Sequence, residues 1–398
     1  MKGEVCIHGY LLPSCATEQC VSSIWLDGTS LPILCVARSS LILKMIAGIF
    51  STIPLLVAAE PELHDYASSF TLENDAFFQT DKYYTDGFQL TVKGRIDERS
   101  ESTKNILKAA CILASCESDE FQFSQTRVGQ LMYTPVDISN PAPQPLDRPW
   151  AGMLYAANDY HFLSDDEQRL TTITSQMGII GPLSYADRTQ TWIHKTFNNG
   201  TPEGWSNQIG GELGLLASIE RRFAVNPPER EPADSGIQVR AVGHWRLAAG
   251  NIMTYAGAGL TLAVGKNMPL VFPRESGDIT VKVISPKLFS TDHISKAIDN
   301  SCIFQWLRCT AFASVEARLV AWNVFLDGGM FREDPHVTKN PIVADVSLGM
   351  RFDFPKIRNS FTGPWFAQFK ATIRSPEFQS RKSVSSQAFG ALTVGTEF

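Results

Sequence analysis

The sequence predicts an all-β fold, a closed antiparallel β-barrel of about twelve strands that spans a membrane. Three observations support this prediction. Charged residues make up only 19% of the chain, whereas about 25% is typical of soluble proteins. Long segments alternate between apolar and polar residues, and no apolar run of about 20 residues, the length of a transmembrane helix, follows residue 60. A hydrophobic content of 44% argues against a disordered chain, and a net charge of -6 argues against nucleic-acid binding.

The alternating segments have the length of transmembrane strands. Every second residue from Ala344 to Phe354 is apolar, and polar residues or glycine lie between them. Tilted membrane-spanning strands need about 9 to 11 residues, whereas strands of soluble sheets average about 5 to 6. The expected strands are 68–75, 87–95, 121–133, 150–161, 168–181, 206–221, 236–248, 253–265, 309–324, 341–354, 364–375 and 387–398. An even number suits a closed barrel, which leaves no strand edge unpaired in lipid. A soluble sandwich or lipocalin-like barrel would show shorter strands and a more charged outer face.

The segment before the strands has the pattern of a secretory signal. Residues 45–59 form a short apolar run that follows basic residues and ends in Val57, Ala58 and Ala59. A buried core helix is the alternative, but Pro54 within the run favours export. We therefore expect a signal peptide over 45–59 and a barrel domain over 60–398, with translation starting near Met45 and residues 1–44 absent from the mature protein.

Four cysteines of the predicted barrel domain fall into two local pairs. Cys111 and Cys116 form one pair in the sequence, and Cys302 and Cys309 form the other. An exported chain permits disulfides, and the short spacings make two small loops the simplest of the three possible connectivities. The cysteines before residue 40 do not form a convincing zinc pattern.

Strand order predicts which loops share a rim of the barrel. If residue 60 starts in the periplasm, the loops 76–86, 135–148 and 183–205 are extracellular. The loops 96–120 and 266–308 are then periplasmic, where turns are usually short. Both are long, so either they contain small helices or the strand count is wrong there. Residues 101–116 have helical apolar spacing, which favours the first explanation.

Polar residues at strand ends are the main candidates for chemistry. The sequence contains no P-loop, no H-E-x-x-H and no G-x-S-x-G motif. Asn74 and Asp75 end the first predicted strand, and Thr85 begins its partner, so one hairpin gathers three polar groups. Turn chemistry alone would also select these residue types. Two more polar clusters, at 147–152 and 190–205, fall on the same predicted extracellular rim.

Three motifs together resemble one family. They are N-D-x-F-F-x-T-D-x-Y-Y-T-x-G from Asn74, D-R-P-W-A-G from Asp147, and I-G-P…Q…H-K…G-W-x-N-Q from Ile180. This set resembles the outer-membrane lipid A 3'-O-deacylase family over about residues 68–398. The resemblance implies a twelve-stranded barrel in the cell outer membrane, monomeric, that hydrolyses the 3'-linked acyloxyacyl chain of lipid A in lipopolysaccharide. It also implies calcium-dependent chemistry, in which a histidine activates water and calcium stabilises the oxyanion.

The resemblance assigns roles to four residues of the predicted rim. The family's histidine falls on His194, its Asn and Asp on Asn74 and Asp75, and its hairpin threonine on Thr85. These residue types suit the implied mechanism. A neutral imidazole can accept a proton from water, and a carboxylate such as that of Asp75 is a ligand that calcium prefers.

Further residues of the same loops are expected to bind substrate, and two positions depart from the family pattern. Asp147, Arg148 and Glu203 are the predicted substrate-binding residues. The family's acidic residue six positions after the histidine is replaced by Gly200, and a basic residue expected after the third strand is replaced by Asn140. Both departures concern substrate and catalytic competence rather than the fold.

Two alternative functions remain compatible with the same pattern. A non-enzymatic porin or structural barrel would also have polar residues facing the lumen, at the positions Arg240, Arg246, Arg318, Arg351 and Lys370. A barrel of about twelve strands can be filled by side chains, however, so an open pore does not follow. A phospholipase of similar mechanism is the second alternative, because the same histidine and calcium chemistry would cleave a glycerophospholipid ester.

Overall fold

The computed structural model describes residues 23–26, 29–32, 67–78, 82–95, 108, 111–112, 121–197, 200–225, 237–265, 308–354, 365–380 and 384–397. The chain divides into two units, Met1–Glu60 and Pro61–Phe398. The first contains an antiparallel pair of short strands, β1 (Ser23–Leu26) and β2 (Thr29–Pro32). The predicted signal segment, 45–59, lies outside the described residues.

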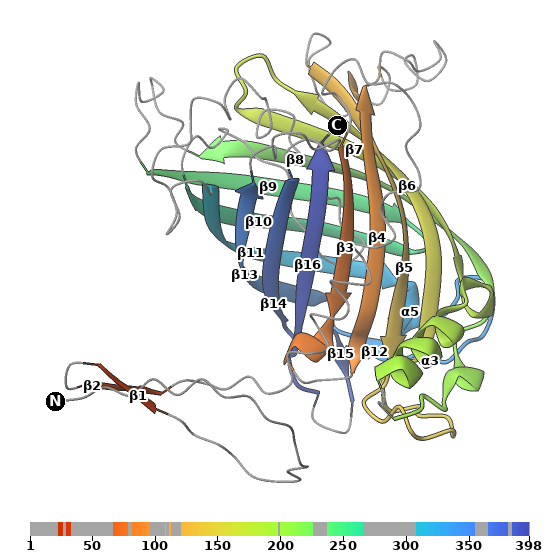
Figure 1. Ribbon diagram of the computed structural model, residues 1–398. Helices are drawn as coiled ribbons and strands as arrows, with labels where there is room; N and C mark the ends of the chain where they lie inside the picture. Colours follow the sequence, from red (N-terminus) through yellow and green to blue (C-terminus); the bar gives the residue numbers. More distant parts are fainter. Residues whose placement is uncertain are drawn as a thin grey trace, which may run out of the picture. The chain divides into compact units, whose positions relative to one another are not determined.

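The second unit is a closed barrel of twelve antiparallel strands, as predicted (Figure 1). Each strand pairs with its neighbours along the chain, and the last strand pairs with the first to close the barrel. The strands are β3 (Ala67–Asn74), β4 (Tyr83–Arg95), β5 (Phe121–Thr134), β6 (Ala151–Leu163), β7 (Arg169–Ile180), β8 (Glu212–Val225), β9 (Gln238–Gly250), β10 (Met253–Gly265), β11 (Arg308–Asn323), β13 (Ile342–Phe354), β14 (Trp365–Arg374) and β16 (Gln387–Glu397).

One rim carries nearly all of the remaining described structure. The loops after β3, β5 and β7 lie there together, as predicted, at the end of the barrel opposite the C-terminus (Figure 1). The elements of these and the neighbouring loops are η2 (Asp75–Phe78), η3 (Pro182–Ser184), α3 (Ala186–Phe197), η4 (Trp205–Asn207), α5 (Val324–Asp327) and the paired strands β12 (Thr338–Lys339) and β15 (Phe378–Gln379). Within the described residues, no helix is long and apolar enough to cross a membrane.

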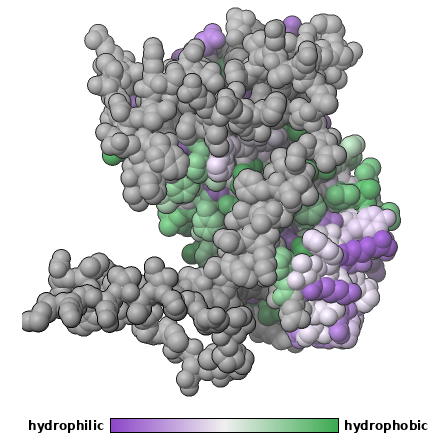
Figure 2. Space-filling view, viewed as in Figure 1, coloured by the Kyte–Doolittle hydropathy of each residue, from purple (hydrophilic) through white to green (hydrophobic). Residues whose placement is uncertain are grey.

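The alternation of the strands separates an apolar outer wall from a polar interior. On β4, Leu90 and Val92 face outward and are 57% and 52% exposed, whereas Gln89 and Thr91, which alternate with them, are buried. The predicted lumen residues, including Arg246 and Lys370, are likewise buried on the inner face. Figure 2 shows hydrophobic residues along the wall, next to the more hydrophilic end that carries α3. Apolar side chains on the wall avoid the cost of leaving polar groups unpaired in hydrocarbon.

The charged residues of the interior are paired with one another. Arg127 donates to Asp159 at 2.5 Å, and Asp345 accepts from both Arg318 and Arg374, at 2.9 and 2.8 Å. Pairing of this kind offsets the cost of removing a charge from water. The interior is therefore a packed, cross-linked region rather than a row of separate charges lining a channel.

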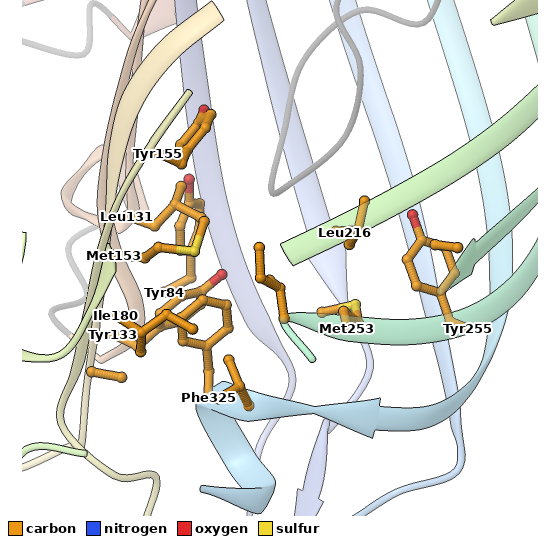
Figure 3. Packing of buried hydrophobic residues seen from close by; sticks show 14 of the residues in the cluster. Tyr84, Leu131, Tyr133, Met153, Tyr155, Ile180, Leu216, Met253, Tyr255 and Phe325 are labelled. Carbon is orange, nitrogen blue, oxygen red and sulfur yellow. The ribbon is translucent and has the colours of Figure 1, made fainter. Parts of the chain in front are cut away.

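Aromatic residues close the interior at the α3 rim (Figure 3). Phe325 of α5 stacks on Tyr133 of β5 with ring centroids 4.4 Å apart. Five strands separate β5 from β11, which precedes α5, in either direction round the barrel. The two rings therefore meet across the lumen. Arg148 adds a second link across it, donating to Glu377 at 2.6 Å.

This filled interior predicts that the protein forms no open pore. In planar bilayers we expect no stable ion-conducting steps, because the Tyr133–Phe325 stack and the Arg148–Glu377 pair cross the lumen. The Phe325→Ala variant removes one ring of the Tyr133–Phe325 stack, and its conductance is compared with that of the wild type. Heat-dependent mobility on gels establishes that the variant is folded. Steady conductance steps of the wild-type protein would contradict the prediction and support the porin alternative.

The predicted limits of two strands are wrong. β4 begins at Tyr83 rather than at residue 87, because Tyr83 to Asp86 are all buried and the alternation disappears there. β8 covers Glu212–Val225 rather than 206–221. Its predicted start is instead η4, where the Trp205 ring packs on the Trp150 ring with centroids 5.0 Å apart.

The opposite rim lies mostly outside the described residues, including most of the loops 96–120 and 266–308. Lys108, Cys111 and Ile112 are helical, in agreement with the predicted helix. Cys111 and Cys309 are each disulfide-bonded. The two local pairings stay a prediction.

Candidate functional site

A row of residues on the outer wall faces away from the lumen, and two of its side chains are nevertheless buried. Asn74, Asp86, Met132 and Gly152 are partners in register on the neighbouring strands β3, β4, β5 and β6. They share the outward parity of exposed wall residues such as Leu90. Nevertheless Asp86 is only 2% exposed and Met132 is fully buried. Another part of the chain must therefore cover the wall at this height.

The connection between β7 and β8 provides this cover. It folds back over the rim as η3, α3 and η4, and α3 packs against β5 and β6. The buried residues of α3 are Ala186, Gln190 and His194, which lie on one face of the helix at intervals of four residues. Gln130 of the wall also donates to the carbonyl oxygen of Ser184 in η3, at 2.5 Å. The site therefore lies between the helix and the lipid-facing side of the barrel.

Gly152 allows this close approach of helix and wall. A Cβ atom at residue 152 would lie 2.3 Å from the Cβ of Ala186 and 2.4 Å from the hydroxyl oxygen of Ser184. Contacts this short are not tolerated, so any side chain at this position must displace η3 and the start of α3. Close packing against Ala186 and Ser184 thus explains why the D-R-P-W-A-G motif ends in glycine.

Substitution of Gly152 should separate the helix from the wall without unfolding the barrel. We expect Gly152→Val to cost about 1 to 3 kcal/mol of stability and to lower any activity of the site at least about tenfold, because His194 moves with the helix. Ala156→Val is the matched control, since Ala156 has the same parity on β6 and is exposed. Similar activity in the two variants would show that the contact between α3 and the wall is not needed.

His194 is held in one orientation by the loop that follows its helix. Its Nδ1 atom donates to the carbonyl oxygen of Gly200, at 2.6 Å, and its side chain is only about 5% exposed. A carbonyl oxygen can only accept, so the proton of the neutral ring is on Nδ1 and the lone pair is on Nε2. The family resemblance predicts a carboxylate at residue 200. In this protein the backbone carbonyl of Gly200 accepts the hydrogen bond from the imidazole instead.

Trp205 and Gln190 attach that loop to the helix. The indole N–H of Trp205 donates to Oε1 of Gln190, at 2.7 Å, one helical turn before His194. Trp205 also packs on Trp150, and a Cβ atom at Gly204 would lie 2.4 Å from the Trp150 ring nitrogen. This tryptophan pair, with Met132 and Ala186, forms the apolar support beneath the helix. The sequence analysis assigned no role to Gln190, although this residue is part of the motif that begins at Ile180.

Asn74 and Asp75 end β3 and close the first hairpin. The Asn74 side chain accepts from the backbone N–H of Ala76 at 2.6 Å, and Asp75 accepts from that of Lys82 at 2.6 Å. Asp75 is about 1% exposed. Part of the turn-chemistry explanation is therefore correct, because both side chains order the loop. A buried carboxylate at a strand end is also a potential ligand for a hard cation.

Thr85 lies at a β-bulge in the adjacent strand. The register of β4 against β5 shifts between Tyr84 and Asp86, so Thr85 is the extra residue. Its hydroxyl lies 2.6 Å from that of Thr134, which has outward parity on β5. The bulge thus presents Thr85 and the neighbouring Asp86 at the covered part of the wall.

Asp86 is a candidate that sequence reasoning missed. It is 2% exposed and lies opposite Asn74 in the register. The signal was present in the sequence, since Asp86 shares the parity of Phe88, Leu90 and Val92 on the lipid-facing side of β4. A carboxylate in such an apolar row is costly in a membrane strand and marks a functional position.

The predicted substrate-binding residues are not gathered at this site. The Arg148 guanidinium lies 4.2 Å from the centre of the Tyr133 ring, on the lumen side of the wall, and pairs with Glu377. Asp147 accepts from the backbone N–H groups of Val136 and Arg148, at 3.1 and 2.7 Å, and orders its own loop. Arg148 therefore lies on the other side of the wall from α3, and substrate binding by Asp147 and Arg148 stays a prediction.

Glu203 and Asn140 lie in two loops that contact each other. Glu203 is exposed, and its backbone N–H donates to the carbonyl oxygen of Ile138 at 2.9 Å. The Asn140 side chain accepts from the N–H of Ala142, at 3.0 Å. Asn207 of η4 donates to the carbonyl oxygen of Pro141, at 2.9 Å, which joins the loops.

The donors near the hairpin suit calcium better than a softer metal. Within the described residues, no three His, Cys, Asp or Glu side chains lie together as a preformed metal cluster. Asp75 and Asp86 are nevertheless buried carboxylates on neighbouring strand ends, and Asn74 lies opposite Asp86. Carboxylate and amide oxygens, supplemented by backbone carbonyls, are the ligands that calcium prefers.

Comparison with known proteins relates the chain to one group. The sequence profile of the family described as outer membrane protein LpxR matches residues 43–398. No curated protein sequence matches the chain. Among solved structures, LpxR from Salmonella typhimurium is 17% identical with a TM-score of 0.60, and the match covers 83% of this chain and 100% of that chain. The β domain of the Bordetella autotransporter BrkA is 9% identical with a TM-score of 0.37, and the match covers 84% of this chain and 98% of that one.

Proposed function

We propose, because the chain belongs to the LpxR family of outer membrane proteins, that it modifies lipid A by hydrolysing the 3'-linked acyloxyacyl ester chain in the outer leaflet. The observation that carries this proposal is the position of His194. His194 belongs to the buried face of α3, the helix that packs on β5 and β6, whereas a hydrolase of soluble esters would need its base in an aqueous pocket. The interior, which is filled and cross-linked, does not compete with this site.

His194 has the arrangement that a general base requires. The bond from Nδ1 to the Gly200 carbonyl oxygen fixes the ring, so that Nε2 can remove a proton from the attacking water. When that proton arrives, the same carbonyl oxygen continues to accept from Nδ1 and orients the imidazolium. General base catalysis of this kind typically contributes about 10²- to 10⁴-fold in rate.

The hairpin residues supply the groups that would hold calcium and the substrate. Asp75 is the proposed ligand, and Asp86, which the structure adds, is a second carboxylate on the next strand end. Asn74 and Thr85 are proposed to orient the ester or the water. When bound, calcium would polarise the ester carbonyl and stabilise the oxyanion. Burial of these groups excludes water and strengthens each electrostatic interaction.

Mass spectrometry of lipid A tests the proposal directly. We expect lipid A from cells that express the protein, with calcium supplied, to lose the mass of the 3'-linked acyloxyacyl chain. Cells that carry an empty vector are the control, and heat-dependent gel mobility establishes that the barrel is folded. Unchanged lipid A together with a folded barrel contradicts the proposal. Loss of acyl chains from phospholipids instead would support the phospholipase alternative.

Gly200, six residues after His194, offers a prediction about the pH dependence of the reaction. A Cβ atom at Gly200 would meet nothing within 4 Å, so a glutamate fits at this position. We expect Gly200→Glu to move the acidic limb of the rate profile to higher pH by about one unit, because a carboxylate near the ring stabilises the imidazolium and the base must be neutral. Initial rates between about pH 5 and 9 measure this shift.

Gly211→Glu is the matched control for that variant. Gly211 is also free of atoms within 4 Å of its Cβ position, and it precedes β8 outside α3. The control should keep the wild-type profile. Identical profiles for Gly200→Glu and Gly211→Glu would show that residue 200 does not influence the ring.

A further inference from the structure

The side of α3 that faces away from the wall has its own pattern. Arg188, Trp192 and Lys195 are exposed and lie at intervals of four and three residues, so they share one helix face. This face, which we call the outer face of α3, lies opposite the buried face of Ala186, Gln190 and His194. Trp192 is 66% exposed, whereas tryptophan side chains of water-facing surfaces are usually largely buried.

The outer face continues the apolar surface of the barrel wall. Met177 and Ile179 at the end of β7 point outward and are 57% and 41% exposed. The chain then passes directly into η3, where Leu183 is 60% exposed, and on to Tyr185, which is 48% exposed. Because the wall residues face hydrocarbon, the residues that follow them at the rim lie at the boundary between hydrocarbon and headgroups. Tryptophan and tyrosine are enriched at this depth in membrane proteins.

Two cations flank the tryptophan on this face. Within the described part of the chain, no carboxylate forms an ion pair with Arg188 or Lys195. The Arg188 guanidinium lies over the Tyr185 ring, 4.8 Å from its centre, and a ring contact of this kind does not use the N–H donors of the guanidinium. Arginine and lysine at a membrane boundary extend their charged ends toward anionic phosphates, and arginine can bind a phosphate through two N–H groups.

We propose that the outer face of α3 binds the anionic phosphate headgroups of lipids in the leaflet around the barrel. In this arrangement Trp192 and Tyr185 insert at the boundary, while Arg188 and Lys195 contact phosphate oxygens on either side. Lipid binding would then hold α3 against the wall from outside. This surface is separate from the buried face that carries His194, and its lipid binding does not depend on the proposed hydrolysis.

Retention of lipids by the purified barrel tests the proposal without any reaction. The full-length folded protein in non-ionic detergent is mixed with phosphatidic acid or with phosphatidylcholine, and native mass spectrometry measures the lipid that stays bound. We expect the wild-type protein to prefer phosphatidic acid. The double variant Arg188→Gln, Lys195→Gln should retain it at least about tenfold less, because each basic residue near an anionic surface contributes roughly fivefold.

Two comparisons make the result specific. Arg332→Gln changes another exposed cation of the same rim, outside α3, and should retain phosphatidic acid like the wild-type protein. Phosphatidylcholine retention should change little in the double variant, because its headgroup carries no net charge. Equal retention of phosphatidic acid by the wild type and the double variant, both folded on gels, would overturn the proposal. Equal losses in the double variant and in Arg332→Gln would also overturn it, because the effect would then be one of general charge.

Discussion

Replacement of His194 by alanine is expected to lower the hydrolysis of lipid A by about 10²- to 10⁴-fold, the usual contribution of a general base. The variant should keep the heat-dependent gel mobility of the folded barrel, because His194 lies in α3, outside the strands. Mass spectrometry of lipid A over a time course measures the rate.

His336→Ala is the control for this effect. His336 is an exposed histidine of the same rim, and its Nδ1 atom lies 3.0 Å from the carbonyl oxygen of Asp334. Its replacement should leave the rate unchanged. If His194→Ala were as active as His336→Ala, another group would have to activate the water and the proposed mechanism would be wrong.

Asp75→Asn is expected to produce the second large effect, a loss of about 10²-fold or more at low calcium. The amide oxygen of asparagine can still accept from the N–H of Lys82, so the hairpin stays closed while the negative charge disappears. Wild-type activity should vanish on chelation and return with added calcium. The variant should need a much higher calcium concentration, which a titration of rate against free calcium measures.

Asp166→Asn is the matched change on the opposite rim. Asp166 orders a hairpin turn by accepting from the N–H of Gln168 at 3.0 Å, as Asp75 does with Lys82. The hydrogen bond from the Ser164 hydroxyl is the main reason why the pKa of Asp166 is lowered, and the hydrogen bond from the Gln168 N–H is the second. This carboxyl is therefore ionised at neutral pH. If chelation had no effect, and Asp75→Asn behaved like Asp166→Asn, calcium ligation by Asp75 would be excluded.

The barrel itself could be predicted because its signal is local. Each strand reveals its two faces by alternation, and strand length distinguishes a membrane wall from a soluble sheet. The start of β4 could not be predicted in this way. Tyr83 is buried by the Phe378 ring, 5.3 Å away, which the loop after β14 contributes from a distant part of the sequence. Burial by another segment removes the alternation on which the prediction depends.

Strand order predicted which rim carries the candidate residues, but it made no prediction about the side of the wall on which they lie. Loop positions placed His194, Asp75 and Thr85 together at one end of the barrel. The choice between lumen and outer wall depends on how α3 docks, which requires the absence of a side chain at Gly152 and the cover over Met132. Arg148 shows the same limitation, because its partner Glu377 follows it by more than two hundred residues. Pairings between residues so far apart produce no periodic pattern in the sequence from which they could be predicted.

If the proposed hydrolysis is correct, the location of His194 outside the barrel also determines how substrate arrives. A lipid would reach this face by lateral diffusion within one leaflet, so the relevant concentration would be the number of substrate molecules per unit of membrane area. Inert lipid added to the same leaflet would then dilute the substrate and slow the reaction, even at a constant amount of substrate in the whole sample. The enzyme would thus respond to the composition of its immediate membrane surroundings, and two cells with equal amounts of the protein could modify their surfaces at different rates.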